Sequence, residues 1–145
     1  MGTKGEYRIR EVDGEGDEDD IHALHDACFG DLVCSPIAEG WWWLVYDVGK
    51  EPVAFAHLLP SRQWSDTGYL ARVGVVPWHR GKGLQRRLIR VREHKARGLG
   101  LVGMVTDTSP SNLASSNNLI RAGYELFVPS HPWSLPHALY WKKWL

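Results

Sequence analysis

A short glycine-containing turn, Arg80-Gly81-Lys82-Gly83, joins an apolar run to a basic segment with helical periodicity. Glycine has no side chain and tolerates positive φ, so such a turn lets backbone N–H groups come close to a ligand. The first turn of a helix adds N–H groups without intrahelical partners, and the helix dipole favours negative charge beside them. The pattern therefore predicts an anion site that suits a pyrophosphate. The alternative is a tight turn into a solvated helix.

The turn differs from two phosphate-binding motifs that it partly matches. No Gly-Lys-Ser/Thr follows four spacer residues, as in a Walker A loop, and Arg86 or Arg87 stands at the third glycine of a GxGxxG turn. The side chains of Arg80, Lys82, Arg86 and Arg87 add positive potential. The context favours the anion site, because an apolar strand ends at Pro77 and the turn then opens a helix.

The elements that must position this turn follow from the hydrophobic periodicity. The order β-α-β-β-β-α-β-α-β-β predicts one mixed α/β domain over residues 1–145. Its two central strands, on either side of a right-handed crossover helix, are expected to be parallel. The expected strands are 7–11, 41–49, 52–60, 69–77, 101–107, 124–128 and 137–145, and the expected helices are 20–28, 84–97 and 114–123.

Local signals mark the ends of some of these elements. Asp19 or Asp20 is expected to cap the first helix and Gly30 to end it. The acidic residues around this cap, together with His22, are interpreted as a solvated loop, and no metal site is predicted. The C-terminal segment YWKKWL is expected to be an edge strand, with lysines that block further pairing.

Composition limits the classes of protein. The chain has 145 residues, 17 basic and 17 acidic side chains, and 43% apolar residues, which is typical of a globular domain. The zero net charge disfavours a nucleic-acid binder. Cys28 and Cys34 are too few for a four-cysteine zinc site or a disulfide framework, so we expect reduced thiols. The sequence shows no signal peptide and no run of 18 apolar residues, so we expect no membrane partner and a cytoplasmic location.

Two motifs, in order, resemble those of the GCN5-related N-acetyltransferase (GNAT) family. The first is Val75-Val76-Pro77 followed by the glycine turn, and the second is Asn112 followed by NNLIRAGY, which ends at Tyr124. The resemblance covers nearly the whole chain. It implies an α/β fold with a splayed pair of parallel central strands, and acetyl-CoA as co-substrate.

The resemblance also implies a set of site residues. The main chain of Val73, Gly74 and Val75 would pair with the pantetheine amides, and an N–H near Val75 would polarise the thioester carbonyl. Asn112 would contact the pantetheine arm or cap its own helix. The residues implied to hold the pyrophosphate are His79, Arg80, Gly81, Lys82, Gly83 and Leu84.

The chain departs from the family pattern at two positions. Trp78 stands where the family often has Gln or Arg, and an indole cannot replace a guanidinium charge. Leu119 stands where many members have the tyrosine that reprotonates the CoA thiolate, and Tyr124 is not an obvious substitute. Water or another group would then supply that proton, or the thiolate would leave unassisted.

The general base is not evident either, because the segment 69–77 contains no glutamate. His57 has a suitable ordinary pKa, although its place in a hairpin favours a packed side chain over a base. Asp107 is expected to hold a loop rather than to react. Further candidates for the base are Asp66, Tyr69 and Glu39.

The predicted function is an acetyl-CoA-dependent N-acetyltransferase that acts on a primary amine of a small molecule or peptide by direct attack in a ternary complex. The alternative is a catalytically idle acyl-CoA sensor or interaction module. The sequence does not identify the acceptor, and the resemblance allows a homodimer. The first loop and the hairpins are expected to select the acceptor, with side chains that either line its pocket or pack in the core: Glu39, Trp41, Trp42, Trp43, Trp64 and Trp133.

Overall fold

The computed structural model describes residues 6–145, and its elements follow the predicted order. A 3₁₀ turn, Pro77–His79, is an addition to the prediction. The first helix begins earlier than predicted, because Asp17 and not Asp19 or Asp20 is its N-cap residue. The strands are β1 (Arg8–Val12), β2 (Trp41–Tyr46), β3 (Pro52–Pro60), β4 (Thr67–Val75), β5 (Gly103–Thr108), β6 (Glu125–Phe127) and β7 (Leu139–Trp144). The helices are α1 (Glu18–Phe29), α2 (Leu84–Gly98) and α3 (Leu113–Arg121).

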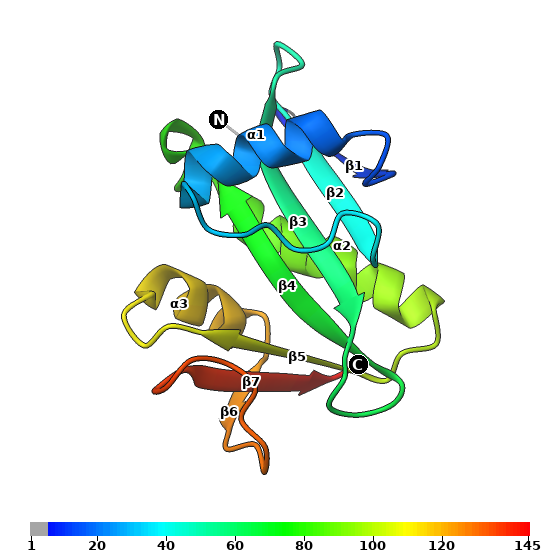
Figure 1. Ribbon diagram of the computed structural model, residues 1–145, viewed down its shortest axis with the longest axis vertical. Coiled ribbons are helices and arrows are strands. Elements are labelled where there is room, and N and C mark those ends of the chain that lie inside the picture. The colour runs from blue at the N-terminus through cyan, green and yellow to red at the C-terminus, as the bar shows by residue number, and fades with distance from the viewer. Residues whose placement is uncertain (1–5) are drawn as a thin grey trace. The chain divides into compact units, whose positions relative to one another are not determined.

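The strands of residues 6–145 form a mixed sheet with the order β1-β2-β3-β4-β5-β7-β6 (Figure 1). The β1–β2, β2–β3, β5–β7 and β6–β7 pairs are antiparallel. The predicted parallel pairing of β4 with β5 is confirmed. The registered pairs join Thr67–Tyr69 to Gly103–Val105, so this ladder is confined to the beginning of both strands.

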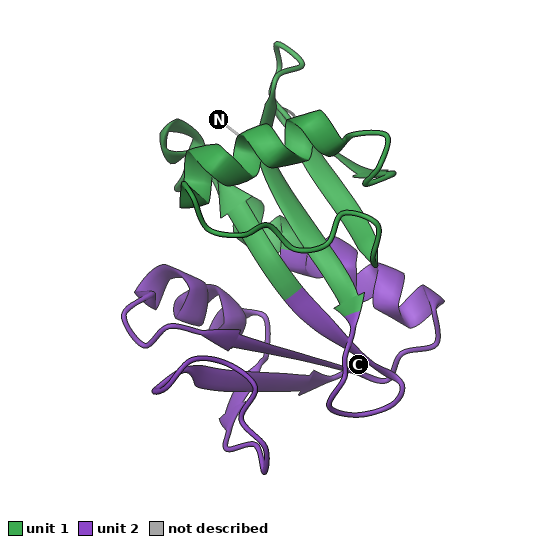
Figure 2. Ribbon diagram, in the orientation of Figure 1, with its two compact units in different colours: residues 1–59, 71–88 green, residues 60–70, 89–145 purple. Residues whose placement is uncertain are grey.

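The chain divides into two compact units (Figure 2). The first contains the residues up to 59 together with 71–88, and the second contains 60–70 together with 89–145. Strand β4 and helix α2 each contribute residues to both units. The single domain expected over residues 1–145 stays a prediction.

The first unit has an aromatic core on β2 and β3, with α1 lying across these strands (Figure 1). Trp42 exposes 1% of its surface and Trp43 exposes 4%. Phe55 is fully buried and its ring centroid lies 6.3 Å from that of Trp42. Ile21 and Leu24 are the buried apolar side chains of α1. The adjacent side chains of Trp42 and Trp43 therefore pack in the core. This agrees with the packing alternative of the sequence analysis and not with a role in lining an acceptor pocket.

Helix α1 approaches β4 closely at Gly74. A Cβ atom at this residue would lie 2.6 Å from Cε1 of Phe55 and 3.0 Å from Sγ of Cys28. Both distances are too short for ordinary packing of a side chain. Glycine is therefore required by the space between the helix and the strand.

A buried histidine of α1 faces an arginine of β4. His25 exposes 1% of its surface, and its Nε2 lies 2.7 Å from Nη1 of Arg72. Burial and, to a smaller extent, the charge of Arg72 lower the pKa of His25 below its ordinary 6.5. The imidazole is therefore neutral at pH 7 and accepts a hydrogen bond from the guanidinium at Nε2.

The second unit is held together by a carboxylate that is almost completely buried. Glu93 of α2 accepts a hydrogen bond from the Tyr124 hydroxyl at 2.7 Å and two from Nζ of Lys143 at 3.1 Å. Lys143 also donates to the Ala122 carbonyl at 2.7 Å. Burial lowers the pKa of the neighbouring Arg92 to about 10, so this guanidinium stays protonated at pH 7. The cluster joins α2 to the end of α3 and to β7.

The prediction that the C-terminal strand lies at the edge of the sheet is wrong. Strand β7 lies between β5 and β6. The segment 125–127 supplies one further strand, so the lysines of β7 do not protect an edge. Lys142 instead lies over the Phe127 ring at 5.4 Å, and Lys143 pairs with Glu93.

We predict that Gly74→Ala lowers the free energy of unfolding by roughly 1–3 kcal/mol, because overpacking forces Phe55 or Cys28 to move. Gly98→Ala is the matched control, because a Cβ atom there has nothing within 4 Å and alanine stabilises helices. Urea unfolding followed by tryptophan fluorescence measures both variants. Equal stability of the two variants would contradict the packing argument.

A second prediction concerns pH. His25 has a lowered pKa in the folded chain, so the unfolded chain binds more protons below about pH 6.5. Its contribution to stability is therefore present above that pH and is lost as the pH falls toward the folded pKa. We expect His25→Gln to lose less stability than the wild type between pH 7.5 and 5.5 in urea unfolding. A His25→Gln slope equal to that of the wild type would refute this assignment.

Candidate active site

The end of β4 turns part of its backbone away from β3. The N–H of Val76 donates to the carbonyl of Val53 on β3 at 3.0 Å. A trans peptide places its C=O opposite its N–H, so the Val75 carbonyl points away from β3. In an extended strand, the N–H and the C=O of one residue point toward the same edge of the strand. The Val75 N–H therefore also points away from β3. Because this direction alternates along the strand, the N–H and C=O of Val73 point away from β3 as well. The strand end thus presents the backbone edge that pairing with a ligand amide requires.

Arg80 folds back from the glycine turn onto this edge. Its Nε donates to the Val75 carbonyl at 2.8 Å, and its guanidinium also interacts with the thiol of Cys28. Burial raises the pKa of the Cys28 thiol, and Arg80 offsets part of that rise. The turn and the strand end are therefore held together by the predicted residue Arg80, and Cys28 is a protonated thiol at pH 7.

Both glycines of the turn have left-handed backbone conformations. Gly81 has φ 77° and Gly83 has φ 78°, and a Cβ atom at either residue would have nothing within 4 Å. The glycines are therefore required by the backbone path, and the space above them is open. The carbonyl of Gly83 accepts from the Arg87 N–H at 3.2 Å, and this bond starts α2 at the buried Leu84.

The first turn of α2 is basic and contains no acidic side chain. Arg86 and Arg87 lie there, four and five residues after the exposed Lys82. Because the dipole makes the N-terminus of a helix partly positive, each cation there is unfavourable by about 0.3–1 kcal/mol. A bound anion would offset this repulsion, so the charges and the open glycine turn fit a diphosphate group.

His79 is fixed by two residues that the sequence analysis missed. Its Nδ1 lies 2.8 Å from the Tyr7 hydroxyl, and its Nε2 lies 3.9 Å from Oδ2 of Asp47. Burial raises the pKa of Tyr7, so the phenol stays protonated. These contacts set the position of the residue that precedes Arg80. No sequence pattern could reveal them, because the three residues lie far apart along the chain.

The model of the Acetyltransferase (GNAT) family matches residues 8–142 of this chain. The chain belongs to the GNAT family. The resemblance inferred from two motifs is therefore confirmed, and membership implies acyl-CoA-dependent acetyl transfer. No curated protein matches the sequence significantly.

Solved structures share the fold of this GNAT protein at low sequence identity. The IAA acetyltransferase of Bacillus cereus is 15% identical with a TM-score of 0.77, over 96% of this chain and 99% of that one. The Bacillus subtilis acetyltransferase in complex with CoA is 16% identical with a TM-score of 0.76, over 95% and 99%. The ribosomal-protein-S18-alanine N-acetyltransferase of Escherichia coli is 15% identical with a TM-score of 0.75, over 95% and 93%. At these identities the likeness establishes the fold alone.

The predicted base His57 lies inside the first unit. It has no exposed surface, and its ring stacks on that of Trp42 with centroids 3.6 Å apart. Its Nε2 lies 2.6 Å from the carbonyl oxygen of Glu39. This environment favours the packing interpretation of His57 over the catalytic one. Glu39 contacts His57 through its main-chain carbonyl, and the residue itself is exposed.

Asp66 lies in the exposed turn that leads into β4, with φ 60°. Its carbonyl accepts a hydrogen bond from the N–H of Val102 at 2.7 Å. The residue therefore fixes the approach of this turn to the segment before β5. A catalytic role for its carboxylate has no support from this geometry.

Asp107, at the end of β5, collects three side-chain hydrogen bonds. Its Oδ2 accepts from the Tyr69 hydroxyl at 2.6 Å and from Nε1 of Trp133 at 2.9 Å. Its Oδ1 accepts from the Ser134 hydroxyl at 3.1 Å. Trp133 packs edge-to-face on Tyr140 at 4.5 Å. Asp107 therefore anchors the loop between β6 and β7, in agreement with the role expected from the sequence.

The second family motif is built into the second unit. Leu119 exposes only 4% of its surface, so this position has an apolar packing role. Burial and the neighbouring carboxylate of Glu93 strongly raise the pKa of Tyr124, whose hydroxyl donates to Glu93. Tyr124 is thus a structural residue. Asn112 is the N-cap of α3 and accepts from the Ser115 N–H at 3.1 Å, as the capping interpretation requires.

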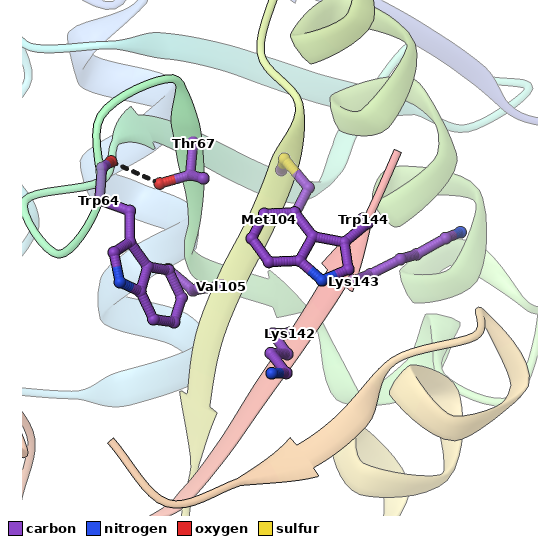
Figure 3. A pocket seen from close by; sticks show the side chains of 7 residues that line it. All are labelled: Trp64, Thr67, Met104, Val105, Lys142, Lys143 and Trp144. Carbon is purple, nitrogen blue, oxygen red and sulfur yellow. Dashed lines mark hydrogen bonds between the residues drawn. The ribbon is translucent and has the colours of Figure 1, made fainter. Parts of the chain in front are cut away.

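Trp64 lines a shallow hollow in the second unit (Figure 3). The main-chain carbonyl of Trp64 accepts a hydrogen bond from the Thr67 hydroxyl at 2.6 Å. The ring centroids of Trp64 and Trp144 lie 6.3 Å apart. The lining includes Lys142 and Lys143 and no carboxylate. Because the lining offers no carboxylate to pair with an ammonium group, this hollow does not suit an amine substrate.

Residues 6–145 contain neither a candidate membrane-spanning helix nor a candidate metal site. No helix in this part of the chain is long and apolar enough to cross a membrane. No three His, Cys, Asp or Glu side chains in the same range are grouped so that they could hold a metal ion.

We predict that Asp107→Ala lowers the free energy of unfolding by about 1–3 kcal/mol, because Tyr69, Trp133 and Ser134 lose their acceptor. The loop between β6 and β7 should also be cut faster in limited proteolysis. Glu125→Ala is the control, because it removes an exposed carboxylate from β6, the strand that precedes this loop. Wild-type stability together with wild-type cleavage would show that Asp107 does not anchor the loop.

Proposed function

We propose that this GNAT protein is an acetyl-CoA-dependent N-acetyltransferase that acetylates a primary amine of a small molecule or peptide. The observation that carries the proposal is the outward-facing backbone of β4 followed directly by a left-handed glycine turn and a basic helix start. Membership of the GNAT family supports the same reading. We further propose that the two units act as one domain, because β4 and α2 contribute to both.

The residues present fit acetyl-CoA. Backbone N–H groups of the turn and of the start of α2 would hold the pyrophosphate, with Lys82 and Arg80 adding positive charge. The outward-facing edge at Val73 and Val75 would pair with the pantetheine amides, while the Gly74 backbone faces the opposite side. Asn112, beyond its capping role, is retained as a contact to the pantetheine arm. The residues proposed to bind the co-substrate are those of the sequence prediction: Val73, Gly74, Val75, His79, Arg80, Gly81, Lys82, Gly83, Leu84 and Asn112.

The proposed reaction is a direct transfer in a ternary complex. The amine nitrogen attacks the thioester carbonyl carbon, the C–S bond breaks, and the products are an N-acetyl amide and CoA. Holding both reactants together supplies much of the rate. The Val75 N–H would stabilise the oxyanion that forms on the carbonyl oxygen, which leaves the outward-facing groups of Val73 and the Val75 carbonyl for the pantetheine amides.

The proton transfers are assigned to water. The acceptor ammonium must lose a proton before attack, and the CoA thiolate gains one after it leaves. His57 is buried against Trp42, and Asp66 supports a turn, so neither is favoured as the base. Leu119 has no proton to give, and a thiolate is a good enough leaving group to depart without an acid.

The names of two structural neighbours support both acceptor classes. The Escherichia coli protein is named for an alanine of a ribosomal protein, and the Bacillus cereus protein is named for a compound abbreviated IAA. The cytoplasmic location and the homodimer stay predictions from the sequence.

An acyl-CoA sensor is the second candidate function. The buried Leu119 at the family's tyrosine position and the lack of a glutamate on β4 favour it. A sensor would bind acetyl-CoA without releasing CoA in the presence of any amine. An enzyme would release CoA with at least one class of amine.

We expect the wild-type protein to bind acetyl-CoA with roughly micromolar affinity in calorimetry. Gly81→Asp and Gly83→Asp should weaken binding by more than about tenfold, because each places a carboxylate against the pyrophosphate. Gly100→Asp is the matched control, since Gly100 also has a left-handed φ of 82° in open space but follows the C-terminal end of α2. Equal weakening in all three variants, or no binding by the wild type, would overturn the proposed co-substrate site.

A further inference from the structure

We propose that Arg72 binds a carboxylate of the acceptor, so that the substrate is an amino carboxylate rather than a simple amine. This inference rests on the proposed function and names its acceptor class. It starts from the way in which the protein uses the guanidinium of Arg72. This residue is partly exposed on β4, directly before the segment 73–75.

The guanidinium of Arg72 makes its hydrogen bonds to the protein through a single nitrogen, Nη1. Nη1 lies 2.7 Å from Nε2 of His25 and donates to the Val33 carbonyl at 2.9 Å. These two acceptors account for both protons of Nη1. Within residues 6–145, the hydrogen bonds of Arg72 all involve this nitrogen. The guanidinium is therefore fixed in orientation by one of its corners.

The opposite edge of the guanidinium carries the Nε proton and the two protons of Nη2. This planar pair of donors matches the two oxygens of a carboxylate, and such bidentate pairs are among the strongest hydrogen bonds in proteins. Because Nη1 already ties β4 to α1 and to the loop after α1, a purely structural role does not require that edge. The edge is thus suited to a ligand.

Among the residues that the structure describes, none forms an ion pair with Arg72. His25 is neutral, the Val33 carbonyl is neutral, and the Phe29 ring lies 4.9 Å from Cζ. Asp26 influences the pKa of His25, yet in the described part of the chain no ion pair joins it to Arg72. A partly buried cation with neutral neighbours favours an anion from outside.

The position of Arg72 relates this anion to the proposed chemistry. The strand rises about 3.3 Å per residue, so Val75 lies roughly 10 Å along β4 from Arg72. Val33 belongs to the first loop, which the sequence analysis expected to select the acceptor. A carboxylate held at Arg72 would therefore be separated by a chain of several atoms from an amine at the thioester. Short and longer amino carboxylates should differ as substrates for this reason.

The test uses matched acceptors that differ in one group. Glycine, β-alanine, 4-aminobutyrate and 6-aminohexanoate are each compared with the corresponding amide, and CoA release gives kcat and KM. We expect at least one carboxylate to exceed its amide in kcat/KM by about tenfold or more, because a hydrogen bond to a charged group is lost in the amide. Arg72→Met should abolish this preference by raising KM for the carboxylate, with little change for the amide.

Control variants separate recognition from structure. Arg72→Lys keeps the positive charge but loses the planar pair of guanidinium donors, so it should retain part of the preference for carboxylate over amide acceptors. This variant also tests the role of Arg72 if Arg72→Met does not fold. Arg62→Met, which removes an exposed arginine, should behave as wild type. Calorimetry of the CoA-loaded protein with N-acetyl-4-aminobutyrate and N-acetyl-6-aminohexanoate measures carboxylate binding without turnover.

The outcomes distinguish this inference from the proposed function. Acetylation of amines without any carboxylate preference, or an equal loss for carboxylate and amide in Arg72→Met, would overturn the role of Arg72 alone. Arg72-dependent carboxylate binding without CoA release from any amine would keep the anion site and refute the transferase. Absence of acetyl-CoA binding would refute the proposed function and, with it, an acceptor site at Arg72.

Discussion

The constraint on which the first unit depends is the pairing of backbone polar groups at the end of β4. Buried N–H and C=O groups need partners, and one side of this strand faces β3 while the other side does not. The Val76 N–H is satisfied by Val53, and the Val75 carbonyl is satisfied by Arg80. A ligand amide is a natural partner for the remaining outward-facing groups. The glycine turn that is proposed to hold the pyrophosphate follows this strand end in the chain.

This arrangement requires α1 to lie close to β4. Gly74 makes the close approach feasible, because any side chain there would meet Phe55 and Cys28. The same approach buries His25 and keeps it neutral beside Arg72. A single packing constraint therefore links the helix position, the protonation state of a histidine and the orientation of a guanidinium.

The second unit depends on two carboxylates with full sets of donors. Glu93 joins α2 to Tyr124 and Lys143, and Asp107 joins β5 to Tyr69 and to the loop between β6 and β7. In both cases the acid organises segments that are distant in the sequence. This explains why residues that resemble catalytic acids and bases in type, such as Tyr124, have structural roles here.

The sequence by itself determined the order of the elements, the parallel central pair, the family and the glycine turn, because periodicity, turn chemistry and short motifs are local signals. It placed the start of α1 too late, at Asp19 or Asp20 instead of Asp17, and it misplaced β7 at the edge because the order of strands in a sheet is not a local signal. Only the tertiary structure decided that His57 stacks on Trp42, that Tyr7 and Asp47 hold His79, and that Arg72 meets His25. These contacts join residues far apart in the chain, and burial and hydrogen-bond geometry set the chemistry of a side chain only after such segments have packed together.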